Sequence, residues 1–456
     1  MRDPGAILLL SCYELGHQPL GTAWPAAFLE RAGFRPAQLD LAVDPLDLAR
    51  VRAAHLVAVS VPMHTALRVG LDVVARIRAV NARCVIVFHG AYAHLNRDYV
   101  RAQGVDVVLA GETEAALVEL ARQLEAGDAP GIAPTAPVLE RLTFPVPSRA
   151  ALPPPSRYAA LEHRGRRVVA AAVETSRGCL SLCRHCPIPP VHGGRFFVVP
   201  PEVVLADIRH VVTAGARHVT FADADFLNGP AHALRVARAL HAEFPAVTFD
   251  FTAKIEHLLR HRAALPELAA LGCLFAVSAV ESLSERVLTV LDKGHDRADV
   301  ETAIGLLRAA GITLRPTFVP FTPWATIDDY LDLLEFVVAQ DLIDCVDPIQ
   351  YGLRLLVPPG SLLLGRAELT PHLEGLDPAA LTWRWTHPDP RMDALQGQVS
   401  ATTREAALRG ADPLETFDRV WDLARAAAAR PIRPRPATRW TVARPRHPRL
   451  TEPWFC

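Results

Sequence analysis

The stretch "RRVVAAAVETSRGCLSLCRHC", residues 166–186, joins an apolar strand pattern to a loop that contains three cysteines. Cys179, Cys183 and Cys186 are separated by three and then by two residues. The apolar run predicts a buried strand, so the cysteines follow its carboxyl end. Thiolates are soft ligands that favour zinc or iron–sulfur centres. The loop therefore predicts one of these centres at the end of a strand.

Five further apolar runs follow the cysteine loop, and each adjoins a helical pattern such as residues 201–215 or 297–311. Together with the strand before the cysteines they predict a partial (β/α)6 barrel of the triosephosphate isomerase (TIM) type, over residues 166–365. Its chemistry is expected at the carboxyl ends of the strands. The five runs are "HVTFADADF" (218–226), "VTFDFTAKIE" (247–256), "CLFAVSAVES" (273–282), "TLRPTFVPF" (313–321) and "CVDPIQYGLRLLVP" (345–358).

Before the barrel, Val/Ile/Leu-rich runs also alternate with amphipathic helical patterns, over residues 6–127. This pattern predicts a doubly wound, Rossmann-like parallel sheet within residues 1–130. Ligands of such sheets bind outside the carboxyl ends of the strands. A domain with ordinary turns and no ligand is the alternative. The candidate ligand residues at the expected strand ends are Ser60, His89, Gly90, Gly111 and Glu112.

Two segments outside these units have a different composition. Residues 131–165 are rich in proline and predict a linker between domains. Residues 366–456 predict a C-terminal extension of helix and Pro/Arg-rich coil. The aromatic residues of "LTWRWTHPDPRMD" (381–393) either cover the barrel mouth or simply cap the core.

Composition limits the function further. Lys and Arg number 48, Asp and Glu 49, and the net charge is −1, so no global field favours nucleic acid or a membrane surface. No apolar run reaches the ~20 residues that span a membrane. Eight scattered cysteines are not typical of a secreted disulfide framework and indicate the reducing cytoplasm. We therefore expect a small-molecule or peptide substrate.

The cysteine loop itself favours iron over zinc. Structural zinc normally has four protein ligands, and the nearby candidates for the fourth are His185 and His192. His185 lies between two of the cysteines, which makes it a poor fourth ligand. A cubane 4Fe-4S cluster needs only three thiolates and leaves one iron open to a small molecule. Gly178 and Pro187 suit a tight loop around it. A zinc-stabilised binding protein remains the alternative from another class.

The Cys-x3-Cys-x2-Cys spacing after the first strand of a barrel resembles the radical S-adenosylmethionine (SAM) superfamily. The resemblance implies that SAM binds the open iron through its amino and carboxylate groups. One electron from the cluster then cleaves SAM to methionine and a 5′-deoxyadenosyl radical. The resemblance also implies an electron donor such as flavodoxin or ferredoxin.

The same resemblance implies roles for five strand-end or loop residues. His185 stands where the family usually has an aromatic residue against the adenine, and Asp223 where a group orients the methionine amine. Glu281 and Ser282, in "VES", resemble the ribose and carboxylate contacts, and Lys254 resembles a cation that reaches the carboxylate. Each is alternatively an ordinary polar residue that ends a barrel strand.

Lysine usage adds a separate argument. Lys254 and Lys293 are the two lysines of the chain, whereas arginine is abundant. A lysine retained against this bias indicates a site that needs a compact ammonium group. Chance is the alternative, and for Lys293 so is a cation at a helix end.

A doubly wound domain before such a barrel resembles the cobalamin-binding subclass of the superfamily. "HGAYAH" (89–94) and "GETE" (111–114) match the loops that this subclass places around the corrin and its nucleotide tail. The better-known cobalamin motif with a histidine ligand is not matched, because "ELGHQPLG" (14–21) has a different spacing. We therefore expect cobalamin without a protein histidine on cobalt. His17, His64 and His94 are hypothetical ligands only.

The resemblance leaves the reaction open. The first hypothesis is a cobalamin-dependent methyl transfer to an unactivated carbon. The second is a radical rearrangement, epimerisation or cyclisation without methyl transfer. A methylthiotransferase is disfavoured, because the first domain of such enzymes holds a second cluster and here that domain has only Cys12 and Cys84.

The end of the chain, "TEPWFC" (451–456), suggests a further hypothesis. Together with other segments it resembles the radical SAM family with a Cys-Cys-Ala-Glu-Pro or Cys-selenocysteine-Ala-Glu-Pro tail (CCAEP/CUAEP). The chain would then stop at a selenocysteine codon read as a stop, and Cys456 would be a candidate catalytic thiol in a redox or tethering role. An idle terminal cysteine is the alternative. The other segments are "FVPFTPW" (318–324), "IQYGLRLLVPPGS" (349–361) and "DPRMDAL" (389–395).

Overall fold

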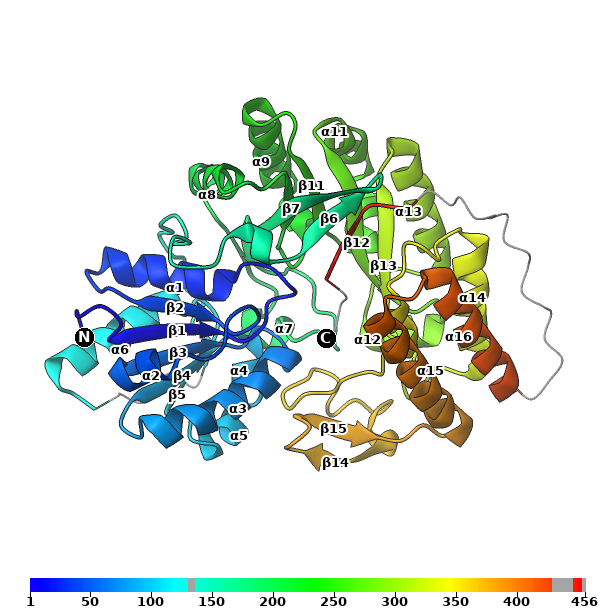
Figure 1. Ribbon diagram of the computed structural model, residues 1–456. Coiled ribbons are helices and arrows are strands. Elements are labelled where there is room, and N and C mark those ends of the chain that lie inside the picture. The colour runs from blue at the N-terminus through cyan, green and yellow to red at the C-terminus, as the bar shows by residue number, and fades with distance from the viewer. Residues whose placement is uncertain (130–135, 429–445, 453–456) are drawn as a thin grey trace.

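The N-terminal part of the chain forms a five-stranded parallel sheet in a computed structural model that describes residues 1–129, 136–428 and 446–452 (Figure 1). Its strand order is β2-β1-β3-β4-β5, so the order reverses between β1 and β3 and a crevice opens at their carboxyl ends. This confirms the predicted doubly wound domain. The strands are β1 (Ile7–Ser11), β2 (Ala37–Asp40), β3 (Leu56–Ser60), β4 (Val85–His89) and β5 (Val107–Leu109).

Helices cover both faces of this sheet because both faces are apolar. In β1, Ile7 and Leu9 belong to the core on one face, and Leu8 and Leu10 to the core on the other. The first face packs against α1 (Leu20–Arg31) and α6 (Glu114–Ala126). The second packs against α2 (Leu48–Ala53), α3 (His64–Val80), α4 (Ala91–Leu95) and α5 (Arg97–Ala102).

The second unit is a curled sheet of order β13-β12-β11-β10-β7-β6-β16, with its helices on the outside (Figure 1). Five neighbouring strands are parallel, as in a half-barrel: β7 (Arg166–Val173), β10 (His218–Phe221), β11 (Thr248–Thr252), β12 (Cys273–Glu281) and β13 (Thr313–Phe318). The helices are α8 (Pro201–Thr213), α9 (Pro230–Glu243), α10 (Ile255–Arg260), α11 (Leu265–Ala270), α12 (Glu285–Leu291), α13 (Arg297–Ala310) and α14 (Ile327–Ala339).

The predicted sixth barrel strand, residues 345–358, is wrong. Pro348 begins a 3-10 helix, η4 (Pro348–Gly352), because proline lacks the N–H that a ladder needs and its fixed φ suits a helix start. Directly after η4, Arg354 forms an isolated parallel bridge with Phe321 and no longer strand pairing. The half-barrel therefore has five parallel strands.

The predicted linker contains part of the second sheet. β6 (Ala160–His163) pairs antiparallel with β7 across Arg164 and Gly165, whose φ values are +50° and +71°. A two-residue turn with positive φ at both positions is the hairpin connection that matches strand twist. The high proline content of the segment led to the prediction of a linker instead of this hairpin. The Arg164-Gly165 pair was the available sequence signal for the turn. Earlier in the linker, Phe144 packs against Trp24 of α1, so the segment is attached to the first unit.

The C-terminal extension has more strand than the predicted helix and coil. It contains β14 (Leu373–Asp377), β15 (Thr382–Trp385), α15 (Pro390–Arg409), α16 (Pro413–Ala428) and β16 (Arg449–Leu450). Trp385 of β15 is buried, and its Nε1 donates to the Leu355 carbonyl, so this aromatic residue caps the core. In the part of the chain that the structure describes, no helix is both long and apolar enough to cross a membrane.

β16 brings the end of the chain back to the open side of the half-barrel (Figure 1). It pairs antiparallel with β6, and Leu450 packs beside Leu161 and Phe275. Just before it, the Pro448 carbonyl accepts a hydrogen bond from Arg315 of β13, at the other edge of the sheet. Residues 446–452 thus bridge the two edges, and we call them the C-terminal strap.

Candidate active site

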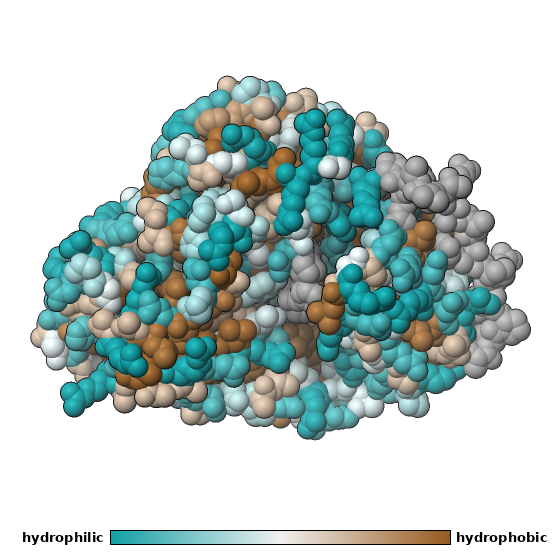
Figure 2. All heavy atoms as spheres, viewed as in Figure 1, coloured by the Kyte–Doolittle hydropathy of each residue, from teal (hydrophilic) through white to brown (hydrophobic). Residues whose placement is uncertain are grey.

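A cavity of about 470 Å3 lies between the carboxyl ends of the two sheets, where the surface is hollowed between the two units (Figure 2). Because parallel strands end at one edge, each unit contributes its strand-end loops to this cavity. The first unit contributes Glu14, His17, Gly21, Ser60, Met63, His89, Gly90, Gly111, Glu112 and Glu114, among others. The second contributes Ala172, Glu174, Ser176, Arg177, Gly178, His192, Ala222 and Ala224, among others.

The structure brings together all five residues predicted to contact cobalamin, because Ser60, His89, Gly90, Gly111 and Glu112 all line the cavity. Gly111 has a φ of +79°, and a Cβ there would lie 2.0 Å from the Val138 carbonyl oxygen. Gly90 has a φ of +114°, so both loops need glycine for their backbone course. The buried His89 Nε2 and Glu112 Oε1 have no hydrogen-bond partner, and Glu112 Oε1 lies 3.9 Å from His192 Nε2.

These features fit a large ligand with many amide groups. Glycine loops allow close approach to the backbone, and unpartnered buried polar atoms normally meet a ligand or water. A carboxylate oxygen accepts the N–H of a ligand amide, and a neutral imidazole accepts or donates. Burial, and then Arg177, lowers the pKa of His89 to about 4, so this ring is neutral. The residues present therefore suit the amide-bearing edge of a corrin.

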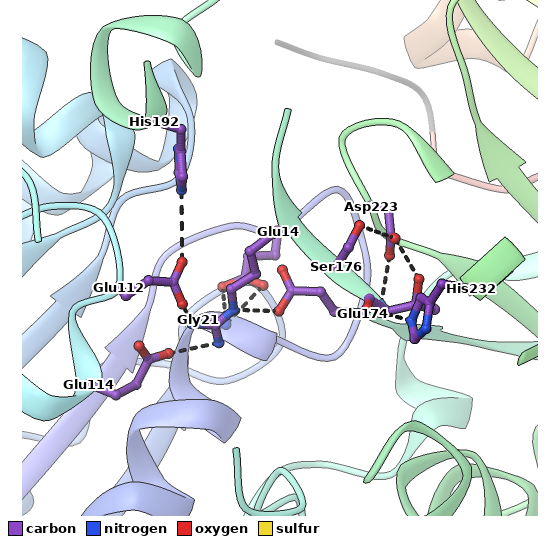
Figure 3. A network of polar contacts seen from close by, with 11 residues as sticks. Glu14, Gly21, Glu112, Glu114, Glu174, Ser176, His192, Asp223 and His232 are labelled. Carbon is purple, nitrogen blue, oxygen red and sulfur yellow. Dashed lines mark hydrogen bonds and ion pairs between the residues drawn. The ribbon is translucent and has the colours of Figure 1, made fainter. Parts of the chain in front are cut away.

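Arg177 joins the two units inside the cavity, because it forms ion pairs with Glu112, Glu114 and Glu174. Figure 3 shows these three glutamates in one polar network. Arg177 places its guanidinium nitrogens 3.1 Å from Glu112, 2.7 Å from Glu114 and 2.8 Å from Glu174. It also lies over the ring of Trp24, 5.1 Å from the centroid. The residue next to the cysteine loop is thus fixed against the loop after β5.

Two carboxyl groups of the cavity have raised pKa values. Burial raises the pKa of Glu174 to about 7, although Arg177 opposes the shift. Burial, assisted by the charge of Asp40, raises the pKa of Glu14 to about 8. Glu14 accepts hydrogen bonds from the Gly21 N–H at 3.0 Å and from the Ser60 hydroxyl at 3.3 Å. Protonation of Glu14 and Glu174 therefore reduces the negative charge inside the cavity.

The cysteine loop begins at a short antiparallel pair, β8 (Ser176–Gly178) with β9 (Phe196–Val198), which closes the loop at its base. Gly178 has a φ of +78°, and a Cβ there would lie 2.4 Å from the Arg195 carbonyl oxygen, so the turn into the cysteines needs glycine. α7 (Pro189–His192) follows the last cysteine. At the far side of the loop, the Arg184 N–H donates to the Leu291 carbonyl at the end of α12.

The three cysteines are reduced thiols, two of them buried and one half-buried. The Sγ of Cys179 accepts a hydrogen bond from the Ser181 N–H at 3.4 Å. Burial raises the pKa of Cys179 and raises that of Cys186 to about 12. Such thiols ionise readily only beside a strong positive charge, which the irons of a cluster supply. The donor set of three thiols on one loop fits a 4Fe-4S cluster bound by Cys179, Cys183 and Cys186.

Among the residues predicted to bind SAM, His185 and Glu281 lie together, with 3.1 Å between Nε2 and Oε1. Lys293 Nζ lies 3.4 Å from the same carboxylate oxygen. Burial alone would raise the pKa of Glu281, but Lys293 and then His185 outweigh it and lower the pKa to about 2. Glu281 ends β12 with a φ of +68°, a strained conformation for a non-glycine residue. The carboxylate is therefore held ionised at the end of β12.

The other three predicted residues end neighbouring strands. Lys254 follows β11, with its Nζ 3.2 Å from Glu256 Oε2, and Ser282 follows Glu281. Asp223 follows β10 and accepts three hydrogen bonds at 2.6–2.7 Å from Thr175 and Ser176. Burial raises the pKa of Asp223 to about 6 against these bonds. Asp223 thus holds the segment that leads into the cysteine loop.

Of the three histidines considered as cobalt ligands, the structure places only one in the cavity. His17 lines the cavity, and burial lowers its pKa to about 4. His64 Nε2 instead lies 3.0 Å from the Ala380 carbonyl oxygen, in the C-terminal extension, and His94 lies 3.4 Å from Arg97. Neither of these two lines the cavity. Cys456 lies outside the described residues.

Comparison with known proteins agrees with this geometry. Residues 7–121 match the family model described as "B12 binding domain", and residues 173–337 match "Radical SAM superfamily". The two ranges cover more than half of the chain and coincide with its two sheets. The chain thus carries a cobalamin-binding domain followed by a radical SAM domain. The two matched domain classes are those that bind cobalamin and that use SAM with an iron–sulfur cluster, which disfavours the alternative of a zinc-stabilised binding protein.

Solved structures share this fold at low sequence identity. The cobalamin-dependent radical SAM enzyme OxsB, with aqua-cobalamin bound, has a TM-score of 0.71 at 15% identity and covers 92% of this chain and 71% of its own. The radical SAM methyltransferase TsrM of Kitasatospora setae, with cobalamin and a 4Fe-4S cluster bound, has a TM-score of 0.59 at 17% identity. It covers 74% of this chain and 73% of its own.

The curated proteins that resemble the chain in sequence are named for other reactions than the two solved structures. The ribosomal protein uS12 methylthiotransferase of Trichlorobacter lovleyi is 23% identical over 192 residues, 37% of this chain and 39% of its own. A tRNA-2-methylthio-N(6)-dimethylallyladenosine synthase of Vibrio vulnificus is 24% identical over 270 residues, 56% of this chain and 52% of its own. The chain thus spans about half the length of these relatives, or less.

Sequence reasoning missed part of the site. Arg177 and Glu174 were not predicted, although Glu174 follows β7 in "VETS" much as Glu281 ends β12 in "VES", and Glu114 was noted only as part of "GETE". That parallel was the available signal for Glu174. Nothing local indicated that Arg177 reaches carboxylates more than 60 residues away in the first unit. The scarcity of lysine pointed to Lys293 as a compact cation at a site, but it did not indicate Glu281 as its partner.

Proposed function

We propose that the enzyme transfers a methyl group to an unactivated carbon of a small-molecule or peptide substrate, in a cobalamin-dependent reaction. The observation that carries this proposal is the single cavity between the two sheets. Ser60, His89 and Gly111 line it from the cobalamin side, and Ser176 and Gly178, at the entry to the cysteine loop, line it from the other. The three cysteines do not line the cavity, but Gly178 directly precedes Cys179, so the cluster loop adjoins this space.

When bound, the cluster and SAM supply one-electron cleavage of the sulfonium, and cobalamin supplies a carrier for the methyl group. The chain's residues bind and orient these groups. Glu281, kept ionised by Lys293 and His185, offers a fixed acceptor for ligand hydroxyls at the end of β12. Lys254 offers a compact cation for the SAM carboxylate, and Asp223 braces the segment before Cys179.

A methylthiotransferase is a weaker candidate, although such enzymes are among the relatives. Cys12 directly follows β1, at the carboxyl edge of the parallel sheet, whereas Cys84 directly precedes β4, at the amino edge. The two thiols thus lie on opposite edges of the sheet and cannot share a cluster. Rearrangement, epimerisation and cyclisation remain the second candidate, because they need the same barrel and no methyl carrier.

The test uses anaerobically reconstituted full-length enzyme loaded with cobalamin and reduced in the presence of SAM. We expect S-adenosylhomocysteine and methylcobalamin in equal amounts without any added substrate. The Cys179→Ala variant should lose 5′-deoxyadenosine formation and keep its bound cobalamin, because the cobalamin residues lie in the other sheet. Cleavage of SAM to 5′-deoxyadenosine alone, with no S-adenosylhomocysteine, would contradict methyl transfer and favour the second candidate.

A further inference from the structure

A second cavity, of about 240 Å3, lies at the amino end of β7, whereas the cofactor cavity lies at the carboxyl end of that strand. The β6–β7 hairpin and the C-terminal strap build it together, although these segments are far apart in sequence. Its lining consists of Glu162, His163, Arg164, Gly165, Arg166, Arg167, Arg446, His447 and Arg449. Five of these residues are arginines and one is acidic.

The positive charge of this basic cavity is only partly neutralised. Arg449 pairs with Glu162 at 2.8 Å, and Arg446 lies 3.4 Å from Asp412. The remaining arginines, Arg164, Arg166 and Arg167, are exposed and have no carboxylate partner in the described part of the chain. Because the whole chain has a net charge of −1, this local excess is not part of a generally basic surface.

His163 adds an observation that does not depend on the arginines. It lines the same cavity, and its Nδ1 is buried without a hydrogen-bond partner. Such atoms in folded proteins normally meet a ligand or an ordered water. The surface around the end of the hairpin is predominantly hydrophilic (Figure 2).

We propose that the basic cavity binds a multiply charged oxyanion, such as a diphosphate. Guanidinium groups bind phosphate oxygens in a bidentate, charge-assisted way and remain charged at all physiological pH values. A cavity of 240 Å3 has the volume of about eight water molecules, which suits a diphosphate group and not a macromolecule. Inorganic diphosphate and a nucleoside diphosphate share this chemistry.

Binding at this site would also hold the C-terminal strap in place. Arg446, His447 and Arg449 belong to the strap, whereas Arg166 and Arg167 belong to the hairpin, so an anion between them joins the two segments. The Thr451 N–H donates to the Ala160 carbonyl at 2.8 Å, next to the β16–β6 pair. Hydrogen exchange of this amide should therefore slow when the anion binds.

The experiment titrates the full-length protein with inorganic diphosphate and, separately, with a nucleoside diphosphate, by calorimetry at low ionic strength. We expect saturable binding that weakens with salt. The Arg166→Gln/Arg167→Gln variant should bind at least about tenfold more weakly, since two charged donors are lost. The matched control is Arg262→Gln/Arg404→Gln, which removes the same charge from exposed positions outside this cavity.

Tighter binding of the nucleoside diphosphate would show that the ligand extends beyond the phosphates, and equal binding would identify the diphosphate alone as the recognised group. Both results support an oxyanion site, provided that the control binds like the wild type. Absence of saturable binding to the wild type would overturn the proposal. An equal loss in both variants would also overturn it, because the anion would then sense only net charge. Equal melting temperatures verify that the variants are folded.

Discussion

Arg177 is the residue on which the arrangement of the two units most depends. It is one buried cation among three carboxylates, and its partners come from both sheets. We predict that Arg177→Gln lowers the free energy of unfolding by about 3–5 kcal/mol, because it leaves buried carboxylates without their partner. Chemical denaturation of the purified protein measures this change.

The control for Arg177 is Arg209, which forms a two-bond pair with Glu243 on the surface. Arg209→Gln should cost less than about 1 kcal/mol, because exposed pairs contribute little. Arg177→Lys keeps the charge but not the planar fork, so it should restore only part of the lost stability. Equal effects of Arg177→Gln and Arg209→Gln would contradict a joining role for Arg177.

Glu14 makes stability depend on pH in a defined direction. Its folded-state pKa of about 8 lies above its ordinary value of 4.5, so the folded protein binds the proton more tightly than the unfolded chain. The proton-linked stability is therefore complete below about pH 4.5 and is lost as the pH rises toward 8. We predict that Glu14→Gln flattens the decline of melting temperature between pH 5 and pH 8.

The matched control for this experiment is Glu119→Gln, which alters an exposed carboxylate of α6. It should leave the pH profile of the wild type unchanged. A Glu14→Gln profile that still falls as steeply as that of the wild type would show that other groups cause the decline.

Lys254 tests the role of a compact cation at the barrel mouth. Its Nζ lies 3.2 Å from Glu256 and only 12% of the side chain is exposed, so a wider guanidinium has little room. We predict that Lys254→Arg slows SAM cleavage by about tenfold, or about 1.4 kcal/mol, at an unchanged melting temperature. Unchanged kinetics of 5′-deoxyadenosine formation would mean that Lys254 only forms an ordinary ion pair with Glu256.

Among the elements, β16 closes the open side of the half-barrel with only two residues. Leu450 packs in a small core with Leu161, Phe275 and Val277. We predict that Leu450→Ala lowers the free energy of unfolding by about 1–2 kcal/mol, as expected for a half-buried leucine. Leu408→Ala, at a side chain that is 84% exposed, is the control and should change little. Equal stability of the two variants would mean that β16 is not part of the folded core.

The parallel strands were predictable because each is a continuous apolar run that ends at polar residues. Residues 345–358 show the limit of this reasoning, since Pro348 interrupts an equally apolar run and begins a 3-10 helix. β6 and β16 were missed because short strands in Pro- and Arg-rich segments have almost no apolar pattern. Their pairing depends on register between segments that are nearly 300 residues apart.

Strand-end positions also explain which site residues were predictable. Ser60, His89 and Glu281 end strands, where ligand residues of both folds gather, so their position could be inferred from local sequence. Arg177 could not be paired in this way with Glu112 and Glu114, because these two of its three partners follow β5 in the other unit. Long-range charge pairing becomes visible only when the two sheets are placed together.

At the scale of the whole molecule, the two sheets present their carboxyl ends to one cavity. The cobalamin-side residues and the segment that enters the cysteine loop line this cavity from opposite sides. Arg177 and the loop after β5 hold these two sides of the cavity together. The C-terminal strap also contacts the first unit, where Glu452 accepts a hydrogen bond from Tyr13 at 2.7 Å. The central claim is that cobalamin occupies this cavity and that the cluster lies directly beside it.

Pulsed electron paramagnetic resonance of the reduced enzyme, loaded with cob(II)alamin and a paramagnetic 4Fe-4S cluster, tests this claim most directly. We predict a resolved dipolar interaction between the two spins, which disappears in the Cys183→Ala variant because the cluster is lost while cobalamin stays bound. Two independent signals in the wild-type enzyme, with the cobalamin spectrum identical in the presence and absence of the cluster, would contradict this claim.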